Sequence, residues 1–246
     1  MLPASIPIVG HQPSPRILAT NPRHQPSPQP TVEVTIPTTS RTSSRAYAEE
    51  FVAEDEVLTT ARAKAAELGC VPIQPGGGAV LRFLAASVQA RAVVEVGTGT
   101  GVSGVWLLRG MRPDGVLTTV DVEAEHQRAA REVFAQAGVP VNRTRVITGR
   151  SLDVLPRLTD GGYDIVYVDG DKKEYTEDLE QAHRLLRIGG VVAFDNALWH
   201  DKVADPAQRD EVTVVLRALG RSLVDDDRFV PALLPVGDGL LVAVKR

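Results

Sequence analysis

The sequence has almost no cysteine and no long apolar run. Cys70 is the single cysteine in 246 residues, which excludes an intramolecular disulfide, and a lone thiol suits packing better than chemistry. No apolar span approaches the roughly 20 residues that a membrane-crossing helix needs. Pro3, Pro7, Pro13 and Pro15 interrupt the apolar stretches that could form the core of a signal peptide. We therefore expect a soluble, cytoplasmic protein.

Positive charge is also not in excess, because the formal net charge is -4. This balance weighs against a nucleic acid as the general partner. Apolar residues make up 43% of the chain, enough for a buried core. They are scarce near the start, where nine of the 17 prolines fall between Pro3 and Pro37 among Ser, Thr and Gln. We expect a disordered tail over residues 1–44, or a start codon assigned too far upstream, and one catalytic domain over residues 45–246.

Apolar runs and helical patterns alternate through this domain. A long helix over residues 45–68 and a second over 78–88 precede the first short apolar run, which is typical of a strand buried on both faces. Strands connected by helices predict a doubly wound, mostly parallel Rossmann-like sheet with helices on both faces and a C-terminal antiparallel hairpin. The predicted strands cover residues 92–96, 116–120, 145–148, 164–168, 190–194, 229–235 and 240–244, and the later helices cover 102–110, 125–137, 151–158, 175–186 and 206–219.

A glycine-rich loop follows the first strand in the stretch VEVGTGTGVSG. Glycines there allow a ligand to approach the backbone, and the next helix offers free N–H groups at its start. Asp121 ends the second strand 20 residues after Gly101, the spacing at which a carboxylate binds ribose hydroxyls. The alternative for Asp121 is a cap of the following helix. The pattern favours a nucleoside-containing ligand at the carboxyl ends of the strands.

Two such ligands fit the loop, a dinucleotide and S-adenosylmethionine. A dinucleotide is bound by the pattern G-x-G-x-x-G, and its turn should begin at the first glycine, Gly97. Counted from Gly97, the pattern has Val102 in place of its last glycine, although counted from Gly99 it is complete at Gly104. Glu95 lies two residues before the first glycine. A carboxylate there suits the ammonium and sulfonium of S-adenosylmethionine better than a phosphate. We therefore expect the methyl donor.

Oxygen ligands end two further strands. Asp169 follows the strand in DIVYVDGDKKEY, and Asp195 with Asn196 follows the next strand in VVAFDNALW. Two carboxylates and an amide suit Mg²⁺, Mn²⁺ or Ca²⁺ rather than zinc, and an octahedral Mg²⁺ would keep about three open positions. The alternative is a pair of ordinary turns. Lys172 lies three residues past Asp169, so it is a candidate general base, whereas Lys173 is predicted to point into solvent.

In order along the chain, VEVGTGTGVS, TTVDVE, VDGDKKEY and FDNALW resemble the cation-dependent O-methyltransferases, which include caffeoyl-CoA and catechol O-methyltransferases and small bacterial relatives. The resemblance covers residues 47–246. It implies a metal held by Asp169, Asp195 and Asn196, with Lys172 as the base. The cofactor contacts that it implies are Glu95, Gly97, Thr98 and Ser103 at the methionine end, Asp121 at the ribose, Ser151 at the adenine, Asp171 near the amine, Ile73 on a covering loop, and Asp169, which stands in both sets.

The resemblance predicts methyl transfer to a hydroxyl of a small catechol-like or phenolic acceptor, by a homodimer. His200 replaces the asparagine of the plant caffeoyl-CoA enzymes and could contact the substrate, or it could simply be exposed; a thioester substrate is not expected. His126 and His183 are predicted to be surface or packing residues. Alternatives are a tRNA hydroxyuridine O-methyltransferase, a non-catalytic nucleoside-binding protein of the same fold, and a dinucleotide reductase. The last would need a Tyr-x-x-x-Lys pair, but the residue four positions after Tyr175 is Leu179 rather than a lysine.

Overall fold

A computed structural model describes residues 38–246 of the chain, with side chains from residue 42 onward. Most of the predicted tail, residues 1–44, lies outside the described residues. Residues 38–44 belong to the first helix, α1 (Thr38–Glu50). Within the described part, no helix is long and apolar enough to cross a membrane.

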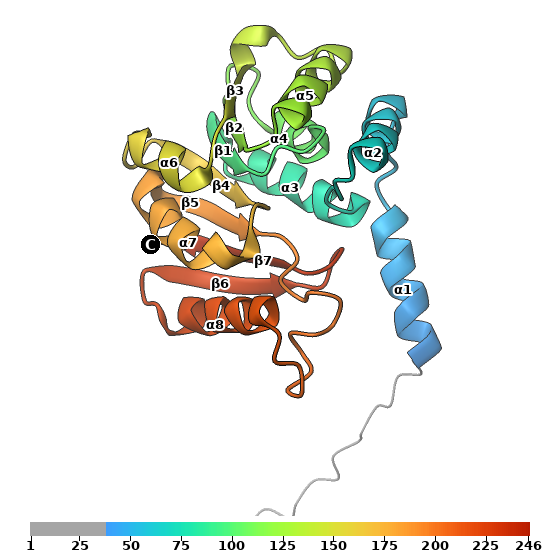
Figure 1. Cartoon of the computed structure of the whole chain (residues 1–246), viewed down its shortest axis with the longest axis vertical. Helices are drawn as coiled ribbons and strands as arrows, with labels where there is room; N and C mark the ends of the chain where they lie inside the picture. The colour runs from blue at the N-terminus through green and yellow to red at the C-terminus, as the bar shows by residue number, and fades with distance from the viewer. Residues whose placement is uncertain (1–37) are drawn as a thin grey trace, which may run out of the picture. The chain divides into compact units, whose positions relative to one another are not determined.

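A seven-stranded sheet forms the centre of the domain, with the order β3-β2-β1-β4-β5-β7-β6. Figure 1 shows β3 at one end of this sheet and β6 at the other. The first five strands are parallel, and β7 runs antiparallel to both β5 and β6, as predicted. The strands are β1 (Ala92–Val96), β2 (Val116–Asp121), β3 (Thr144–Thr148), β4 (Tyr163–Val168), β5 (Leu186–Phe194), β6 (Phe229–Leu234) and β7 (Leu240–Lys245).

The central strands contribute to a separate apolar cluster on each face of the sheet. Successive side chains of a strand point to opposite faces, so Val93 packs in one cluster and Val94 in the other. The first cluster includes residues of α2 (Glu56–Leu68), α3 (Pro75–Ser87), α4 (Val102–Gly110) and α5 (Ala124–Gln136), and the second includes residues of α7 (Tyr175–Leu185) and α8 (Glu211–Asp225). This is the predicted doubly wound architecture.

The order of strands reverses between β1 and β4. The chain builds β2 and β3 on one side of β1 and then crosses to place β4 on the other side. Loops that follow β1 and β4 therefore diverge at their carboxyl ends and open a crevice for a ligand. Every strand-end residue singled out in the sequence, including Asp121, Asp169 and Asp195, lies at this edge of the sheet.

Several helix boundaries differ from those predicted. The expected helix over residues 45–68 is two helices, because the Asp55 side chain accepts a hydrogen bond from Leu58 N at 3.2 Å and starts α2 afresh. The last helix, predicted over 206–219, is shifted to Glu211–Asp225, since Asp210 caps it by accepting from Thr213 N at 3.2 Å. The helix predicted over 151–158 is α6 (Ser151–Val154) followed by a short 3-10 turn, η2 (Leu155–Arg157), and β5 begins at Leu186 rather than at residue 190.

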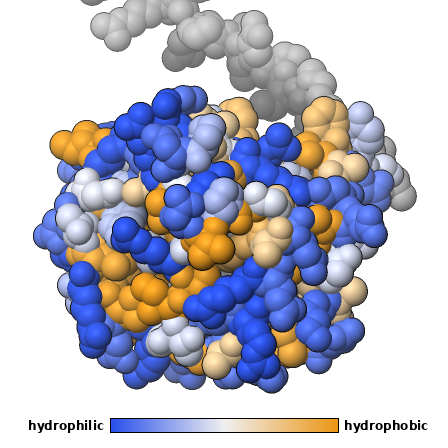
Figure 2. Space-filling model, turned by 90° about the horizontal axis from the view of Figure 1, so that it is seen from above, coloured by the Kyte–Doolittle hydropathy of each residue, from blue (hydrophilic) through white to orange (hydrophobic). Residues whose placement is uncertain are grey.

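The surface mixes hydrophilic and hydrophobic residues. On the face seen in Figure 2, hydrophobic patches lie between hydrophilic groups. Tyr47 and Phe51, at and just after the end of α1, are 70% and 72% exposed. Single apolar side chains at a surface are common, but two adjacent aromatic rings, with centroids 6.1 Å apart, form a local apolar spot.

Candidate active site

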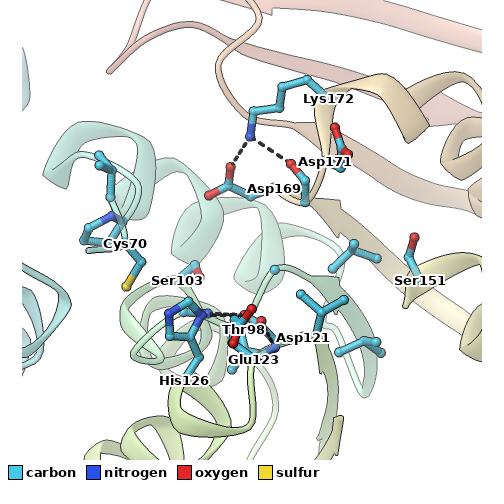
Figure 3. Close-up of a pocket in the computed structure, with 18 of the residues that line it drawn as sticks. Cys70, Thr98, Ser103, Asp121, Glu123, His126, Ser151, Asp169, Asp171 and Lys172 are labelled. Atoms are coloured by element: carbon cyan, nitrogen blue, oxygen red, sulfur yellow. Dashed lines mark hydrogen bonds and ion pairs between the residues drawn. The ribbon is translucent and has the colours of Figure 1, made fainter. Parts of the chain in front are cut away.

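A pocket of about 640 Å³ opens at the carboxyl edge of the sheet, where the ligand crevice is expected. Its walls are the loops after β1, β2, β4 and β5, together with the loop between α2 and α3 and the turn before α6. Figure 3 shows the side chains of these loops, which come from far-apart parts of the chain and face one cavity. Nearly all of the predicted site residues line it or lie directly beneath it.

The glycine loop after β1 brings two backbone segments into close contact. Gly97 has φ of 90°, and a Cβ atom there would collide with the carbonyl oxygen of Asp169. Gly101, with φ of 87°, precedes the first residue of α4, so the free N–H groups of that helix point toward the pocket. Only glycine therefore fits at position 97, and the loop exposes backbone donors to a ligand.

Glu95 lies buried beneath this loop. Its Oε2 accepts a hydrogen bond from the Thr119 hydroxyl at 2.6 Å, while its Oε1 has no hydrogen-bond partner in the described part of the chain. Burial raises the pKa of Glu95 to about 7, and the hydroxyls of Ser103 and Thr119 oppose that rise. Thr98 completes the layer, with its hydroxyl 2.6 Å from Thr119 Oγ1. A buried carboxylate oxygen without a donor suits a cationic ligand group.

Asp121 orders the loops around the next strand end. Its carboxylate accepts hydrogen bonds from the backbone N–H groups of Gly99 and Glu123, each at 2.9 Å. His126, in the first turn of α5, lies with Nδ1 3.4 Å from Asp121 Oδ2, and both side chains line the pocket (Figure 3). The structure thus places His126, predicted to be a surface or packing residue, in the wall of the pocket.

The covering loop between α2 and α3 lines the pocket through other residues than predicted. Cys70, Val71 and Pro72 form this wall. Ile73 instead is 3% exposed and packs in the apolar core, and its carbonyl oxygen accepts a hydrogen bond from Arg62 Nη2 at 2.6 Å. The structure therefore places the Ile73 side chain in the core, because the chain turns inward there to begin α3.

The predicted adenine end of the pocket is polar and partly closed by an ion pair. Ser151 is buried, and its hydroxyl donates to Glu174 Oε2 at 3.3 Å. The same carboxylate pairs with Arg150, so Glu174 also shapes this wall. Asp171 lines the pocket while its Oδ1 accepts from Lys173 N at 3.0 Å, which starts the short 3-10 helix η3 (Lys172–Glu174).

At the other end of the pocket two acidic side chains lie together. Asp169 and Asp195 end the neighbouring strands β4 and β5, and the Tyr167 hydroxyl lies 3.4 Å from Asp169 Oδ2 and 3.3 Å from Asp195 Oδ2. Burial, and then the nearby Asp169 charge, raise the pKa of Asp195 to about 7. Burial likewise raises the pKa of Asp169, against the effect of the Lys172 ammonium, whose Nζ lies 2.7 Å from Asp169 Oδ1.

The family model of O-methyltransferases matches residues 42–246 of this chain. A protein of Mycobacterium tuberculosis (strain ATCC 25618 / H37Rv) that is named a probable O-methyltransferase is 46% identical over 200 residues, covering 81% of this chain and 89% of its own. The chain belongs to the O-methyltransferase family. This membership confirms the predicted enzyme class, an S-adenosylmethionine-dependent O-methyltransferase.

Solved structures agree with this assignment. The O-methyltransferase TomG from Streptomyces achromogenes, solved in complex with S-adenosylmethionine, is 31% identical with a TM-score of 0.75, covering 85% of this chain and 99% of its own. An O-methyltransferase from Bacillus cereus, solved with S-adenosylhomocysteine, is 25% identical with a TM-score of 0.74, covering 83% and 97%. The predicted Rossmann-like methyltransferase fold is thereby confirmed.

The loop that follows β5 in this O-methyltransferase is held by a residue that the sequence reasoning missed. Asp238, in the turn between β6 and β7, accepts from His200 N at 2.6 Å and from Asn196 Nδ2 at 3.4 Å. His200 itself is exposed at the pocket rim. Asn196 and His200 both have left-handed backbones, with φ of 56° and 55°, which the Asp238 contacts help to hold.

The residues present fit a divalent cation. Among the described residues, no three His, Cys, Asp or Glu side chains come together as ligands; the predicted set instead combines Asp169 and Asp195 with the amide of Asn196. Two carboxylates held close in a buried place repel one another, and after burial, which is the larger cause, this repulsion raises the pKa of Asp195. A hard cation would remove it, and carboxylate and amide oxygens are its preferred ligands.

Proposed function

We propose that this O-methyltransferase moves the methyl group of S-adenosylmethionine to a hydroxyl of a small catechol-like or phenolic acceptor in the cytoplasm, and that the reaction depends on Mg²⁺, Mn²⁺ or Ca²⁺. The observation that carries the proposal is the pair of carboxylates, Asp169 and Asp195, which share the Tyr167 hydroxyl beside Lys172. Asp169 lines the pocket, and Asp195 lies buried beside it, just before the loop of residues 196–200. Hard oxygen ligands at that place suit a cation that also binds substrate oxygens.

The methyl donor would occupy the part of the pocket between the glycine loop and Ser151. Glu95, buried beneath the glycine loop, has an unpartnered oxygen that would attract its ammonium group, and Asp121, which lines the pocket, would bind its ribose hydroxyls. Gly97 and Gly101 allow the backbone to approach it closely. Neighbouring residues hold each of these groups in place before any ligand binds, so binding the donor costs little conformational entropy of the protein.

When bound, S-adenosylmethionine supplies a reactive methyl group on a sulfonium, and a divalent cation held by Asp169, Asp195 and Asn196 supplies positive charge that acidifies a nearby hydroxyl. The chain itself orients the acceptor oxygen toward the donor and provides the base. Lys172, in its uncharged form, takes the hydroxyl proton at Nζ. The acceptor oxygen then bonds to the methyl carbon while the carbon–sulfur bond breaks, and its electron pair stays on sulfur.

The test is a methyl-transfer screen over catechols, flavonoids, hydroxycinnamates and tRNA, with and without added Mg²⁺. We expect transfer to catechols that EDTA abolishes and Mg²⁺ restores, and we expect Asp169→Ala to abolish it under all conditions. Full activity of Asp169→Ala in EDTA would refute the role of the cation. Transfer to tRNA but to no small phenol would refute the acceptor class, and binding of the donor without any turnover would refute the enzyme role.

We further propose that the enzyme is a homodimer. The adjacent exposed rings of Tyr47 and Phe51 support an apolar contact at the end of α1. Size-exclusion chromatography with light scattering should give twice the mass of the chain, and replacing both rings with serine should give a monomer. A monomeric wild type would refute this.

A further inference from the structure

Tyr167 is a fully buried tyrosine in the middle of the sheet. It lies on β4, with Glu95 of β1 on one side and Ala193 of β5 on the other, and its side chain is 0% exposed. Its ring packs in the first apolar cluster, while its hydroxyl reaches the carboxyl edge of the sheet. A buried hydroxyl is costly unless it is hydrogen-bonded, so its partners should matter.

Those partners are the two carboxylates of the proposed cation site. The hydroxyl lies 3.4 Å from Asp169 Oδ2 and 3.3 Å from Asp195 Oδ2, and it has one hydrogen to donate, so it can donate to only one of them at a time. The other oxygen of each carboxylate is held elsewhere: Asp169 Oδ1 by Lys172 and Asp195 Oδ1 by Asn196 N at 2.8 Å. Tyr167 is thus the group that fixes both Oδ2 atoms at one point.

Tyr175 provides a contrast in the same place. It is also 0% exposed, and its hydroxyl also reaches the ends of β4 and β5, but it donates to backbone carbonyls, of Val168 at 3.2 Å and of Asp195 at 3.3 Å. The two tyrosines therefore hold the same two strand ends in different ways. Tyr175 hydrogen-bonds to the backbones of the two strand ends, and Tyr167 hydrogen-bonds to their carboxylates.

We propose that Tyr167 is a positioning residue that holds Asp169 and Asp195 side by side as ligands for a divalent cation. The inference rests on the proposed cation dependence. Groups that orient metal ligands from behind change metal affinity by about 10- to 100-fold when they are removed. Replacing Tyr167 with phenylalanine keeps the ring in the apolar cluster and removes only the oxygen, so the carboxylates lose their shared contact while the packing remains.

The experiment is a Mn²⁺ titration of the full chain, without the methyl donor, by isothermal calorimetry and by the loss of the free-ion electron paramagnetic resonance signal. We expect Tyr167→Phe to bind Mn²⁺ about 10- to 100-fold more weakly than the wild type, and Tyr175→Phe to bind within about threefold of it. Circular dichroism and thermal unfolding in EDTA check that both variants are folded. Incorporating 4-aminophenylalanine at position 167, which restores a donor on the same ring, should recover most of the affinity.

The outcomes separate the two proposals. Unchanged or tighter Mn²⁺ binding by Tyr167→Phe, with a wild type that binds, would overturn the role of Tyr167 and leave the cation site standing. A wild type that binds no Mn²⁺ would overturn both. If Tyr167→Phe does not fold, the tyrosine absorption difference between samples with and without Mn²⁺ decides. Mn²⁺ should change the tyrosine absorption equally in the wild type and in Tyr175→Phe, because both keep Tyr167. No change in either protein would overturn the proposal.

Discussion

The buried carboxyl of Glu95 should make the stability of the ligand-free enzyme depend on pH. In the folded chain its pKa is raised from 4.5 to about 7 by burial, so the folded state holds a proton that the unfolded state has already lost between these values. The free energy of unfolding must then fall as the pH rises through this window. Above about pH 7 both states are ionised, and this contribution is constant.

The size of the effect follows from the same values. A rise from 4.5 to about 7 corresponds to about 3 kcal/mol at 1.36 kcal/mol per pKa unit, of which about 2 to 3 kcal/mol falls between pH 5 and pH 8. The pKa values of Asp178 and Asp195 are also raised to about 7 by burial, so they add changes of the same sign. The share of Glu95 must therefore be measured as a difference between variants.

Glu95→Gln removes the titrating group and keeps the size of the side chain. We expect the stability of the wild type, relative to this variant, to fall by about 2 to 3 kcal/mol from pH 5 to pH 8 in urea unfolding without ligand. Glu132→Gln, at an exposed position of α5, should run parallel to the wild type. Added S-adenosylmethionine should flatten the wild-type slope, because a cationic ligand favours the ionised carboxylate. Parallel curves for the wild type and Glu95→Gln would refute the reasoning.

Three further substitutions test other parts of the structure. Gly97→Ala puts a Cβ against the Asp169 carbonyl oxygen at a left-handed position, so we expect a loss of more than about 1 kcal/mol in urea unfolding and weaker donor binding by calorimetry; unchanged values would contradict the loop contact. Lys172→Met should lower kcat by about 10² to 10⁴ with little change in donor affinity, while Lys173→Met keeps wild-type kcat; equal effects would contradict the base assignment. Asp55→Ala removes the cap of α2 and should cost about 1 kcal/mol in thermal unfolding without changing kcat, and unaltered stability would contradict the capping role.

The sheet and the strand-end residues could be predicted because they follow from short-range patterns. Apolar runs mark buried strands, and polar residues that follow them must gather at one edge when the strands are parallel. The helix boundaries were harder to predict. Residues 51–55 break a helical pattern only because Asp55 caps a new helix, and Asp210 rather than Pro206 begins the last one.

The residues that were missed act through distant contacts, which no local pattern contains. Tyr167 reads as an ordinary strand residue until β5 brings Asp195 beside its hydroxyl. Asp238 belongs to a hairpin turn, yet it holds Asn196 and His200 some 40 residues earlier in the chain. Ile73 was placed on the pocket by resemblance, and the inward turn of the chain before α3 moves its side chain into the core. Such pairings depend on tertiary packing and not on sequence spacing.

The hairpin turn that carries Asp238 also joins the first helix. Arg45 donates to the Gly237 carbonyl oxygen at 2.8 Å, and the Glu49 carboxylate accepts from Gly237 N. The first helix and the last hairpin thus meet at Gly237, next to Asp238, which contacts Asn196 and His200. We therefore expect that disturbing either α1 or the last hairpin, in a shortened or tagged version, will move Asp238 and with it Asn196 and His200. A loss of activity in such a version will then not by itself indicate a loss of folding.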